Sequence, residues 1–222
     1  PNNPSGVVYP KENLEALGEL LRCKSAEYGA PIYLISDEPY REIAYDGVEI
    51  PYVTKFYANT FVAYSFSKTL SIPGERIGYL IVSPEMKQWR EMANAVTVAN
   101  RVCGFVNAPS LLQKAAARCL EEKCDIAFYD NNRKLLWGGL TELGFECVKP
   151  EGTFYLFVKS PEPDEQNFVV RAKAHNLILV AGSTFAMPGY VRIAYCVSPD
   201  VIKRSMPHFA DLAAEYGLKN GI

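Results

Sequence analysis

The sequence predicts an α/β protein, with a mixed, mostly parallel sheet and helices in residues 1–124, followed by a small α+β C-terminal domain in residues 125–222. Three apolar runs, Ile32–Ile35, Phe61–Tyr64 and Ile77–Val82, have the length and the aromatic or β-branched content of strands. They alternate with longer segments of helical periodicity, which is the pattern of α/β sheets. The order of strands and helices changes near residue 125, so we place the domain boundary there.

Three helices are expected in the first domain, each with apolar residues at helical spacing: 11–28, 85–99 and 111–122. Ser83-Pro84 suits the cap and first turn of the second helix, and residues 101–109 contain the Gly, Asn and Pro of a break. The second domain should begin with a helix from Asp125 to Leu143. Its further elements are expected to be strands over 153–158, 177–180 and 191–195 and helices over 167–175 and 201–216.

The composition narrows the classes of function. The formal net charge is −2, and lysines and arginines are scattered, which argues against a nucleic-acid or acidic-membrane surface. No apolar run reaches the roughly 18 residues of a membrane span. The six cysteines form no close C-x-x-C pair and are expected to be reduced core thiols of a cytoplasmic protein. Only two histidines occur, neither at metal-ligand spacing, so we expect neither a metal site nor a histidine triad. Small molecules or another subunit remain as partners.

Lys68 is the first candidate for chemistry, because Ser65-Phe66-Ser67-Lys68 follows the strand Phe61–Tyr64 directly. Strand ends are where α/β proteins place their sites. A lysine there can be desolvated, which lowers its pKa and lets the neutral amine form a Schiff base with a carbonyl. The alternative is a solvated surface lysine, which is the commoner fate of this residue type.

Asp37 follows the apolar run Ile32–Ile35 in the same way, within Ser36-Asp37-Glu38-Pro39-Tyr40. A carboxylate at the end of a buried strand needs a cation or donors, and a protonated pyridine nitrogen or an arginine would serve. The alternative is that Asp37 caps a turn before Pro39. Tyr40 offers a phenol that could hydrogen-bond to the same ligand.

An anion site is predicted from Arg76 together with Ser65 and Ser67. The guanidinium fork matches phosphate oxygens, and the two hydroxyls would add to it. Neither G-x-G-x-x-G nor G-x-x-x-x-G-K-[ST] occurs, which disfavours a nucleotide-binding loop.

Arg192 lies on the face of the run Tyr190–Ala194 opposite Val191 and Ile193. An arginine there would suit bidentate capture of a substrate carboxylate, or would form a surface ion pair. Asn3, in the opening turn, is either a turn residue or an amide donor to a ligand.

The pattern Ser65-x-x-Lys68 also matches the S-x-x-K of serine acyl-transfer enzymes. Their partner motifs S-D-N and K-T-G are absent from the sequence, so we reject this alternative.

Five motifs in order, Asn-Asn-Pro-Ser-Gly, Ser-Asp-Glu-Pro-Tyr, Ser-Phe-Ser-Lys, Glu-Arg-Ile-Gly-Tyr and Tyr-Val-Arg-Ile-Ala-Tyr, make the chain resemble the class I/II aminotransferases of pyridoxal-phosphate fold type I. The resemblance is to aspartate aminotransferase-like enzymes and runs from Pro1 to the end. It implies a partial large domain of the pyridoxal-phosphate transferase fold and a small C-terminal domain.

The resemblance implies pyridoxal 5′-phosphate as the cofactor and a role for each candidate. Lys68 would carry it covalently and then act as general base and acid. Asp37 would keep the pyridine nitrogen protonated. Asn3 and Tyr40 would hydrogen-bond to the phenolic oxygen, with Asn3 also near the substrate. The phosphate would be held by Ser65, Ser67 and Arg76, and the substrate α-carboxylate by Arg192.

The implied reaction is ping-pong transfer of an amino group from an L-amino acid to a 2-oxo acid in a homodimer. The same lysine and cofactor would also serve a C–S β-lyase, and an inactive fragment or a regulator domain is a third alternative. Arg101 matches a segment that, in some relatives, binds a distal carboxylate across the dimer, or is a surface arginine at a helix end.

Two departures from the family stand out. The opening Pro1–Gly6 has no methionine and reads as a loop in mid-course, so we expect a fragment that lacks the family's N-terminal part. The segment Phe185–Tyr190 is shorter than the usual glycine-rich approach to the arginine strand, which affects the expected geometry near Arg192.

Overall fold

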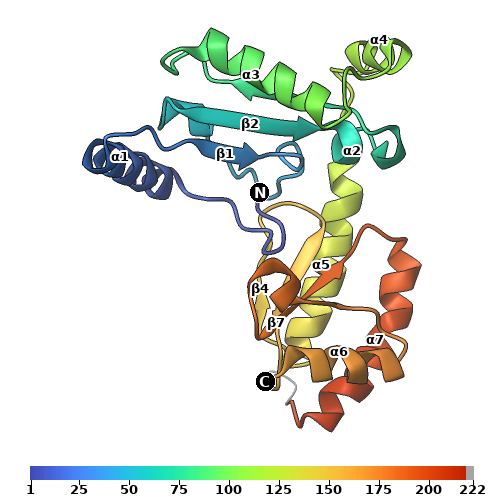
Figure 1. Cartoon of the computed structure of the whole chain (residues 1–222). Helices are drawn as coiled ribbons and strands as arrows, with labels where there is room; N and C mark the ends of the chain where they lie inside the picture. The colour runs from blue at the N-terminus through green and yellow to red at the C-terminus, as the bar shows by residue number, and fades with distance from the viewer. Residues whose placement is uncertain (219–222) are drawn as a thin grey trace. The chain divides into compact units, whose positions relative to one another are not determined.

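The structure, a computed structural model, describes residues 1–218, which form two compact units (Figure 1). The unit that contains Lys68, called here the lysine unit, consists of Tyr9–Glu42 and Glu49–Cys124. The unit that contains Arg192, called the arginine unit, consists of Pro1–Val8, Ile43–Val48 and the described chain from Asp125 onward.

This division differs from a first domain of residues 1–124, because residues 1–8 and 43–48 group with the arginine unit. Backbone hydrogen bonds hold them there. The amide of Tyr45 donates to the carbonyl of Glu151 over 2.9 Å, and the amides of Glu151 and Gly152 both donate to the carbonyl of Gly6 over 2.9 Å. These partners lie far apart along the chain, so no local sequence pattern could predict these hydrogen bonds.

The lysine unit begins with helix α1 (Lys11–Tyr28), which ends at Gly29 in the left-handed conformation at φ 64°. Strand β1 (Leu34–Asp37) and strand β2 (Thr60–Ser65) are parallel, with Leu34 opposite Thr60 and Asp37 opposite Ala63. The short 3-10 helix η1 (Val53–Lys55) lies between them in sequence. The carboxyl ends of both strands therefore reach the same edge of the sheet.

Strand β3 (Gly78–Val82) pairs with β2 in the antiparallel sense and completes a mixed three-stranded sheet of order β1-β2-β3. Between β2 and β3 lie the four-residue helix α2 (Phe66–Thr69) and the 3-10 helix η2 (Pro73–Glu75). We expected β2 to be buried, and it is buried on one face, through Thr60, Val62 and Tyr64.

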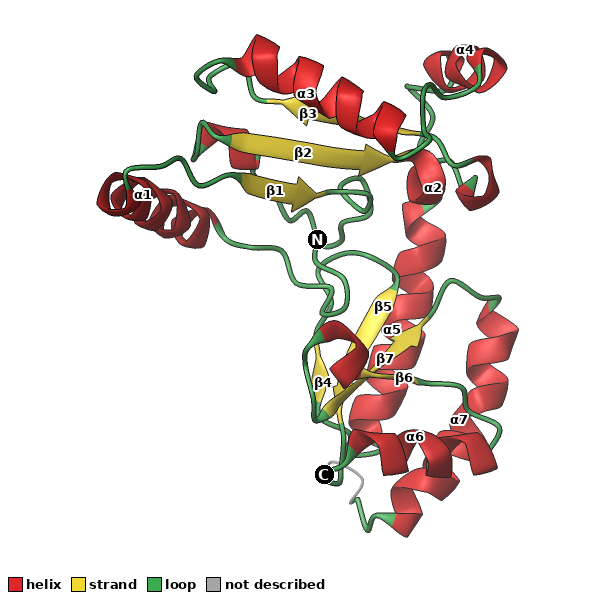
Figure 2. Ribbon diagram, viewed as in Figure 1, coloured by secondary structure: helices red, strands yellow, loops and turns green. Residues whose placement is uncertain are grey.

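Helices α3 (Trp89–Val102) and α4 (Ser110–Arg118) complete the lysine unit, with α3 packed along β3 (Figure 2). The helix expected from residue 85 starts at Trp89 instead. Ser83 Oγ does accept from the amide of Glu85 over 3.3 Å, but this closes a turn, and the positive φ of Gln88, 63°, separates that turn from the helix.

The arginine unit has a four-stranded antiparallel sheet of order β4-β5-β7-β6. The strands are β4 (Cys147–Val148), β5 (Tyr155–Lys159), β6 (Val180–Ala181) and β7 (Tyr190–Ala194). The helices are α5 (Ile126–Glu142), α6 (Glu165–Ala174), α7 (Pro199–Glu215) and the 3-10 helix η3 (Gly182–Phe185). Helices α5 and α6 contact the sheet, and α7 packs on both of them (Figure 2).

Two strands of this sheet are shorter than the sequence suggested. The run expected from residue 177 pairs only at Val180–Ala181, because Ile178 is 89% exposed and the chain there has left the sheet. Strand β5 starts at Tyr155 because Thr153 has a positive φ of 63°. The core of the unit is apolar, with fully buried Leu140, Leu156 and Val191.

No helix within residues 1–218 has both the length and the apolar character needed to cross a membrane. Our expectation of core thiols was wrong, since Cys23, Cys103 and Cys196 are exposed and the other three cysteines are only half-buried. Cys23 lies in α1 and Cys103 directly follows α3, and both are exposed. Helical periodicity in the sequence does not distinguish such an exposed cysteine from an apolar core residue.

Candidate active site

Lys68 lies in the last turn of α2, where strand β2 turns into a helix. Ser65 is extended (φ −137°) and caps this helix, because its Oγ accepts from the amide of Ser67 over 3.2 Å. The Oγ atoms of Ser65 and Ser67 are also 2.7 Å apart and share a hydrogen bond. The cap fixes where the helix begins and therefore where the lysine side chain leaves the backbone.

Tyr40 supplies the environment of the amine. Its ring is 5% exposed, and Lys68 Nζ lies 5.6 Å from the ring centroid. The aromatic face attracts a cation and gives one apolar wall to the amine. Tyr40 follows β1 and Lys68 follows β2, so the parallel pairing of these strands is what brings the two residues to one edge of the sheet.

Asp37 is the last residue of β1 and belongs to the same edge. Asp37 is exposed by its total surface, but the partial desolvation of its carboxyl group raises the pKa of that group. A carboxylate in this state favours a ligand with a positive charge or an N–H donor.

Arg76 comes back to this edge through the antiparallel β2–β3 pairing. The residue after it, Ile77, accepts a hydrogen bond from the amide of Phe66 over 3.1 Å. Arg76 itself is left-handed at φ 53°, an uncommon conformation for a residue with a side chain, and its Nη1 donates to the carbonyl of Pro73 over 3.0 Å. Arg76 is exposed, and the residues directly after it contact Ser65: Ser65 Oγ donates to the carbonyl of Ile77 over 3.4 Å, and Ser65 pairs with Gly78.

Gly78 makes the close approach of β3 possible. A Cβ atom at this position would lie 2.2 Å from the carbonyl oxygen of Tyr64, so any side chain would push the strands apart. The glycine thereby holds the segment that follows Arg76 against the lysine turn.

Arg192 and Asn3 form a second group, in the arginine unit. Arg192 Nη1 donates to Asn3 Oδ1 over 2.8 Å. The guanidinium lies between two aromatic rings, with its carbon 4.1 Å from the centroid of Tyr155 and 4.4 Å from that of Phe185. As the strand alternation predicted, Val191 and Ile193 point to the opposite face and are buried.

The structure thus distributes the predicted site residues over two groups. One group lies at the strand ends of the lysine unit and comprises Asp37, Tyr40, Ser65, Ser67, Lys68 and Arg76. The other, in the arginine unit, comprises Asn3 and Arg192. Arg101 lies exposed in the last turn of α3.

Sequence reasoning missed several residues that support these groups. Tyr155 and Phe185 stack on Arg192, and Phe185 belongs to the short segment 185–190 that departed from the expected pattern. Glu42 and Thr69 bond to Tyr64 beneath the lysine turn. The nearest available signal was the polar Thr69 directly after Lys68, because a hydroxyl that becomes buried close to a strand end needs a hydrogen-bond partner.

The model of the family described as "Aminotransferase class I and II" matches residues 1–209. The chain belongs to this family. An aspartate/prephenate aminotransferase of Thermus thermophilus is 32% identical over 214 residues, which are 95% of this chain and 54% of that relative. An amino transferase crystal structure from Eubacterium rectale matches with a TM-score of 0.94 and 50% identity, over 97% of this chain and 54% of that one.

A third relative is an aspartate aminotransferase from Thermotoga maritima, whose crystal structure has a TM-score of 0.81 and 30% identity over 96% of this chain and 55% of that chain. The predicted α/β fold and the resemblance to class I/II aminotransferases are confirmed. The chain spans about half the length of the relatives it matches.

Class I and II aminotransferases depend on pyridoxal 5′-phosphate, and the donor set of the lysine unit fits that group. The Lys68 amine beside an aromatic ring suits the aldehyde of the cofactor, and the Asp37 carboxylate suits its pyridine nitrogen. The two serine hydroxyls at the helix cap and the neighbouring Arg76 guanidinium suit its phosphate. The residues present therefore agree with the cofactor of the family.

Proposed function

We propose that the whole protein is a pyridoxal 5′-phosphate-dependent aminotransferase that moves an amino group from an L-amino acid to a 2-oxo acid. The observation that carries the proposal is Lys68 at the carboxyl end of β2, beside Tyr40 and on the sheet edge that also ends with Asp37. Membership of the aminotransferase family supports the same reaction.

Bound at this edge, pyridoxal 5′-phosphate supplies a carbonyl that takes the amine and an electron-poor ring that stabilises negative charge at the substrate Cα. Lys68 would hold the cofactor through its amine and, as a free amine, would take a proton from the substrate Cα and return one later. The Tyr40 ring packs beside this amine, 5.6 Å from its centroid, and limits where the amine can move.

Asp37 holds the pyridine nitrogen in its protonated form, because the partly desolvated carboxylate gains a cationic partner. Ser65, Ser67 and Arg76 hold the phosphate, and Tyr40 and Asn3 donate to the phenolic oxygen. Arg192 binds the substrate α-carboxylate, with its guanidinium oriented by Asn3 and two aromatic rings.

For the substrate we propose an aspartate-type amino acid, in keeping with relatives named aspartate and aspartate/prephenate aminotransferases. We further propose that the whole protein works as a cytoplasmic homodimer. Arg101 would bind the distal carboxylate of such a substrate only across a dimer interface, so substituting Arg101 tests the aspartate-type substrate and the homodimer together.

The experiment uses the whole protein and its Lys68→Ala variant. The wild type should take up the cofactor with the visible absorbance of its lysine-bound form and convert aspartate and 2-oxoglutarate into oxaloacetate and glutamate. The variant should lose that absorbance. If cystathionine yields pyruvate and ammonia and aspartate gives no amino transfer, the protein is a C–S β-lyase instead. If the wild type binds no cofactor, the protein is a non-catalytic domain.

A further inference from the structure

Glu42, Tyr64 and Thr69 form a triangle of short polar contacts beneath the lysine turn. Tyr64 Oη is 2.8 Å from Glu42 Oε2 and 2.7 Å from Thr69 Oγ1, and Thr69 Oγ1 donates to the same Oε2 over 3.1 Å. Tyr64 and Thr69 are each 8% exposed. Hydrogen bonds to an ionised carboxylate are stronger than neutral ones, so this is a tight cluster for its size.

The triangle joins the two ends of the lysine turn. Tyr64 is on β2 just before the turn, and Thr69 is the last residue of α2, directly after Lys68. Glu42 arrives from the segment after β1. A helix of four residues has almost no stability of its own, because the cost of nucleation is not repaid by further turns. Side-chain anchors must therefore hold it.

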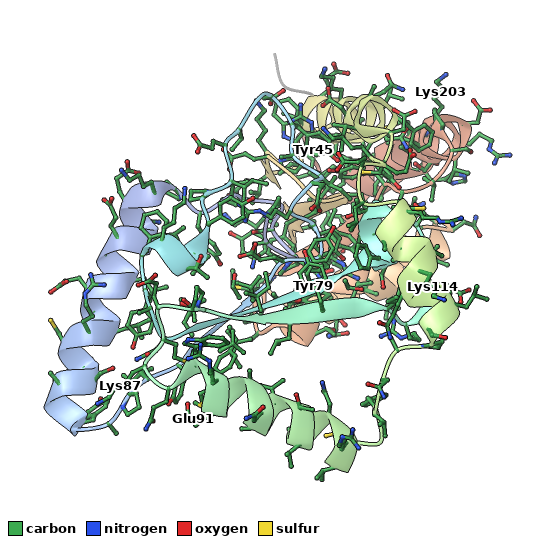
Figure 3. The ribbon with its side chains drawn as sticks, turned by 90° about the horizontal axis from the view of Figure 1, so that it is seen from above. Tyr45, Tyr79, Lys87, Glu91, Lys114 and Lys203 are labelled. Carbon is green, nitrogen blue, oxygen red and sulfur yellow. The ribbon has the colours of Figure 1, made fainter. Side chains whose placement is uncertain are left out.

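Two anchors are present, one on each side of Lys68. The cap by Ser65 holds the start of α2, and the triangle holds its end. Packing fixes the phenol in place, because the Tyr64 ring stacks on Tyr79 with centroids 4.8 Å apart and meets Phe66 edge-on at 5.4 Å. Tyr79, labelled in Figure 3, comes from β3, so β2, β3 and the segment after β1 all contribute to the anchor.

Tyr64 is suited to donate rather than ionise. Burial, together with the neighbouring Glu42 carboxylate, raises the pKa of the phenol, so the hydroxyl keeps its proton at physiological pH. Tyr64 and Thr69 each have one hydroxyl proton and the carboxylate has none, so two of the three contacts are hydrogen bonds at any moment: Tyr64 donates to Glu42, and Thr69 donates either to Glu42 or to Tyr64.

We propose that Glu42, Tyr64 and Thr69 are positioning residues that fix the backbone of Lys68 so that its amine is held against Tyr40. This inference rests on the proposed function, in which that amine carries the cofactor and moves the Cα proton. Placement matters there, because a displacement on the order of 1 Å can cost about 100-fold in rate.

The test compares Thr69→Val, which has nearly the same shape but no hydroxyl, with Thr69→Ser, which keeps the hydroxyl. Tyr64→Phe removes the phenol and keeps the ring, and Thr97→Val, at an exposed position of α3, controls for a valine substitution as such. The first measurement is amide hydrogen exchange of a peptide covering residues 64–70 in the whole protein without added cofactor. Thr69→Val and Tyr64→Phe should exchange on the order of 10-fold faster there, and Thr69→Ser close to wild type.

The second measurement is the split between kcat and KM with aspartate and 2-oxoglutarate. We expect kcat to fall about 10-fold in Thr69→Val and Tyr64→Phe, with KM changed less than about 2-fold, and the serine variant to restore kcat. Wild-type exchange and kcat in both deletion variants would overturn the inference. If the wild type binds no pyridoxal 5′-phosphate, the proposed function fails, and the exchange comparison alone then decides whether the triangle orders the lysine turn.

Discussion

Replacing Arg133 with methionine should destabilise the arginine unit much more than replacing the neighbouring Lys134 with methionine. The guanidinium is 4% exposed and makes a two-point ion pair with Asp46, at 3.0 and 2.8 Å. It also bonds to Asp130 over 2.8 Å and to the carbonyl of Pro150 over 2.9 Å. It therefore ties the segment 43–48 to helix α5 and to the turn before β5.

The magnitude follows from what the substitution leaves behind. Breaking a buried ion pair costs about 3–5 kcal/mol when the remaining charge stays buried. Here Asp46 is 41% and Asp130 is 23% exposed, so both carboxylates regain water and losing the ion pairs costs less than this range, about 1–2 kcal/mol. The buried carbonyl of Pro150 still loses its donor, at about 1–3 kcal/mol. We expect a loss of about 3 kcal/mol, which is on the order of 100-fold in the unfolding equilibrium constant.

The assay is urea unfolding followed by the fluorescence of Trp137, which lies in α5 close to Arg133 in sequence, in a Trp89→Phe background. With a slope of about 2 kcal/mol per M, the midpoint should fall by about 1.5 M. Lys134→Met is the matched control, because Lys134 shares Asp130 as partner but is 64% exposed, so its loss should stay below about 0.5 kcal/mol. Equal midpoints for the two variants would refute the reasoning.

Three further predictions concern single residues of the two units. The Glu165 carboxylate accepts hydrogen bonds from the backbone amides of Ser183 and Gly189, between β6 and β7, and these bonds hold its pKa below the ordinary value. Its contribution to stability is therefore present above about pH 4.5 and is lost as the pH falls through the folded pKa. Glu165→Gln should make the urea midpoint depend less on pH between pH 7 and 3, and equal pH dependence in the two proteins would contradict this. Gly78→Ala should lower stability by about 1–3 kcal/mol in thermal unfolding, because the added methyl meets a backbone carbonyl of β2, whereas Gly74→Ala, in open space, should not. Arg192→Lys should raise the KM for the amino acid at least about 10-fold while cofactor absorbance stays unchanged, and an unchanged KM would remove Arg192 from the substrate carboxylate.

The sequence was most informative where polar residues directly follow apolar runs. Lys68 after one strand and Asp37 after another could be placed on one sheet edge, because parallel strands end together, and the structure has them so. Strand alternation likewise gave the face of Arg192. These inferences need only local periodicity and one rule about sheets.

What local patterns could not show are the contacts between residues distant in sequence. The bond between Asn3 and Arg192 joins opposite ends of the chain, and Glu42 meets Thr69 only after β2 has formed beside β1. Helix and strand limits also shifted wherever a residue with positive φ interrupted a good pattern, as Gln88 does before α3 and Thr153 before β5.

Because the two units alternate along the chain, neither can be expressed as one continuous fragment. The chain passes from one unit to the other after Val8, Glu42, Val48 and Cys124. A gene fragment that starts at Asp125 would lack Asp46, the main partner of Arg133, and Asn3, the partner of Arg192. The arginine unit is therefore not one continuous stretch of sequence, and moving it into a related protein requires three separate segments to be transferred together.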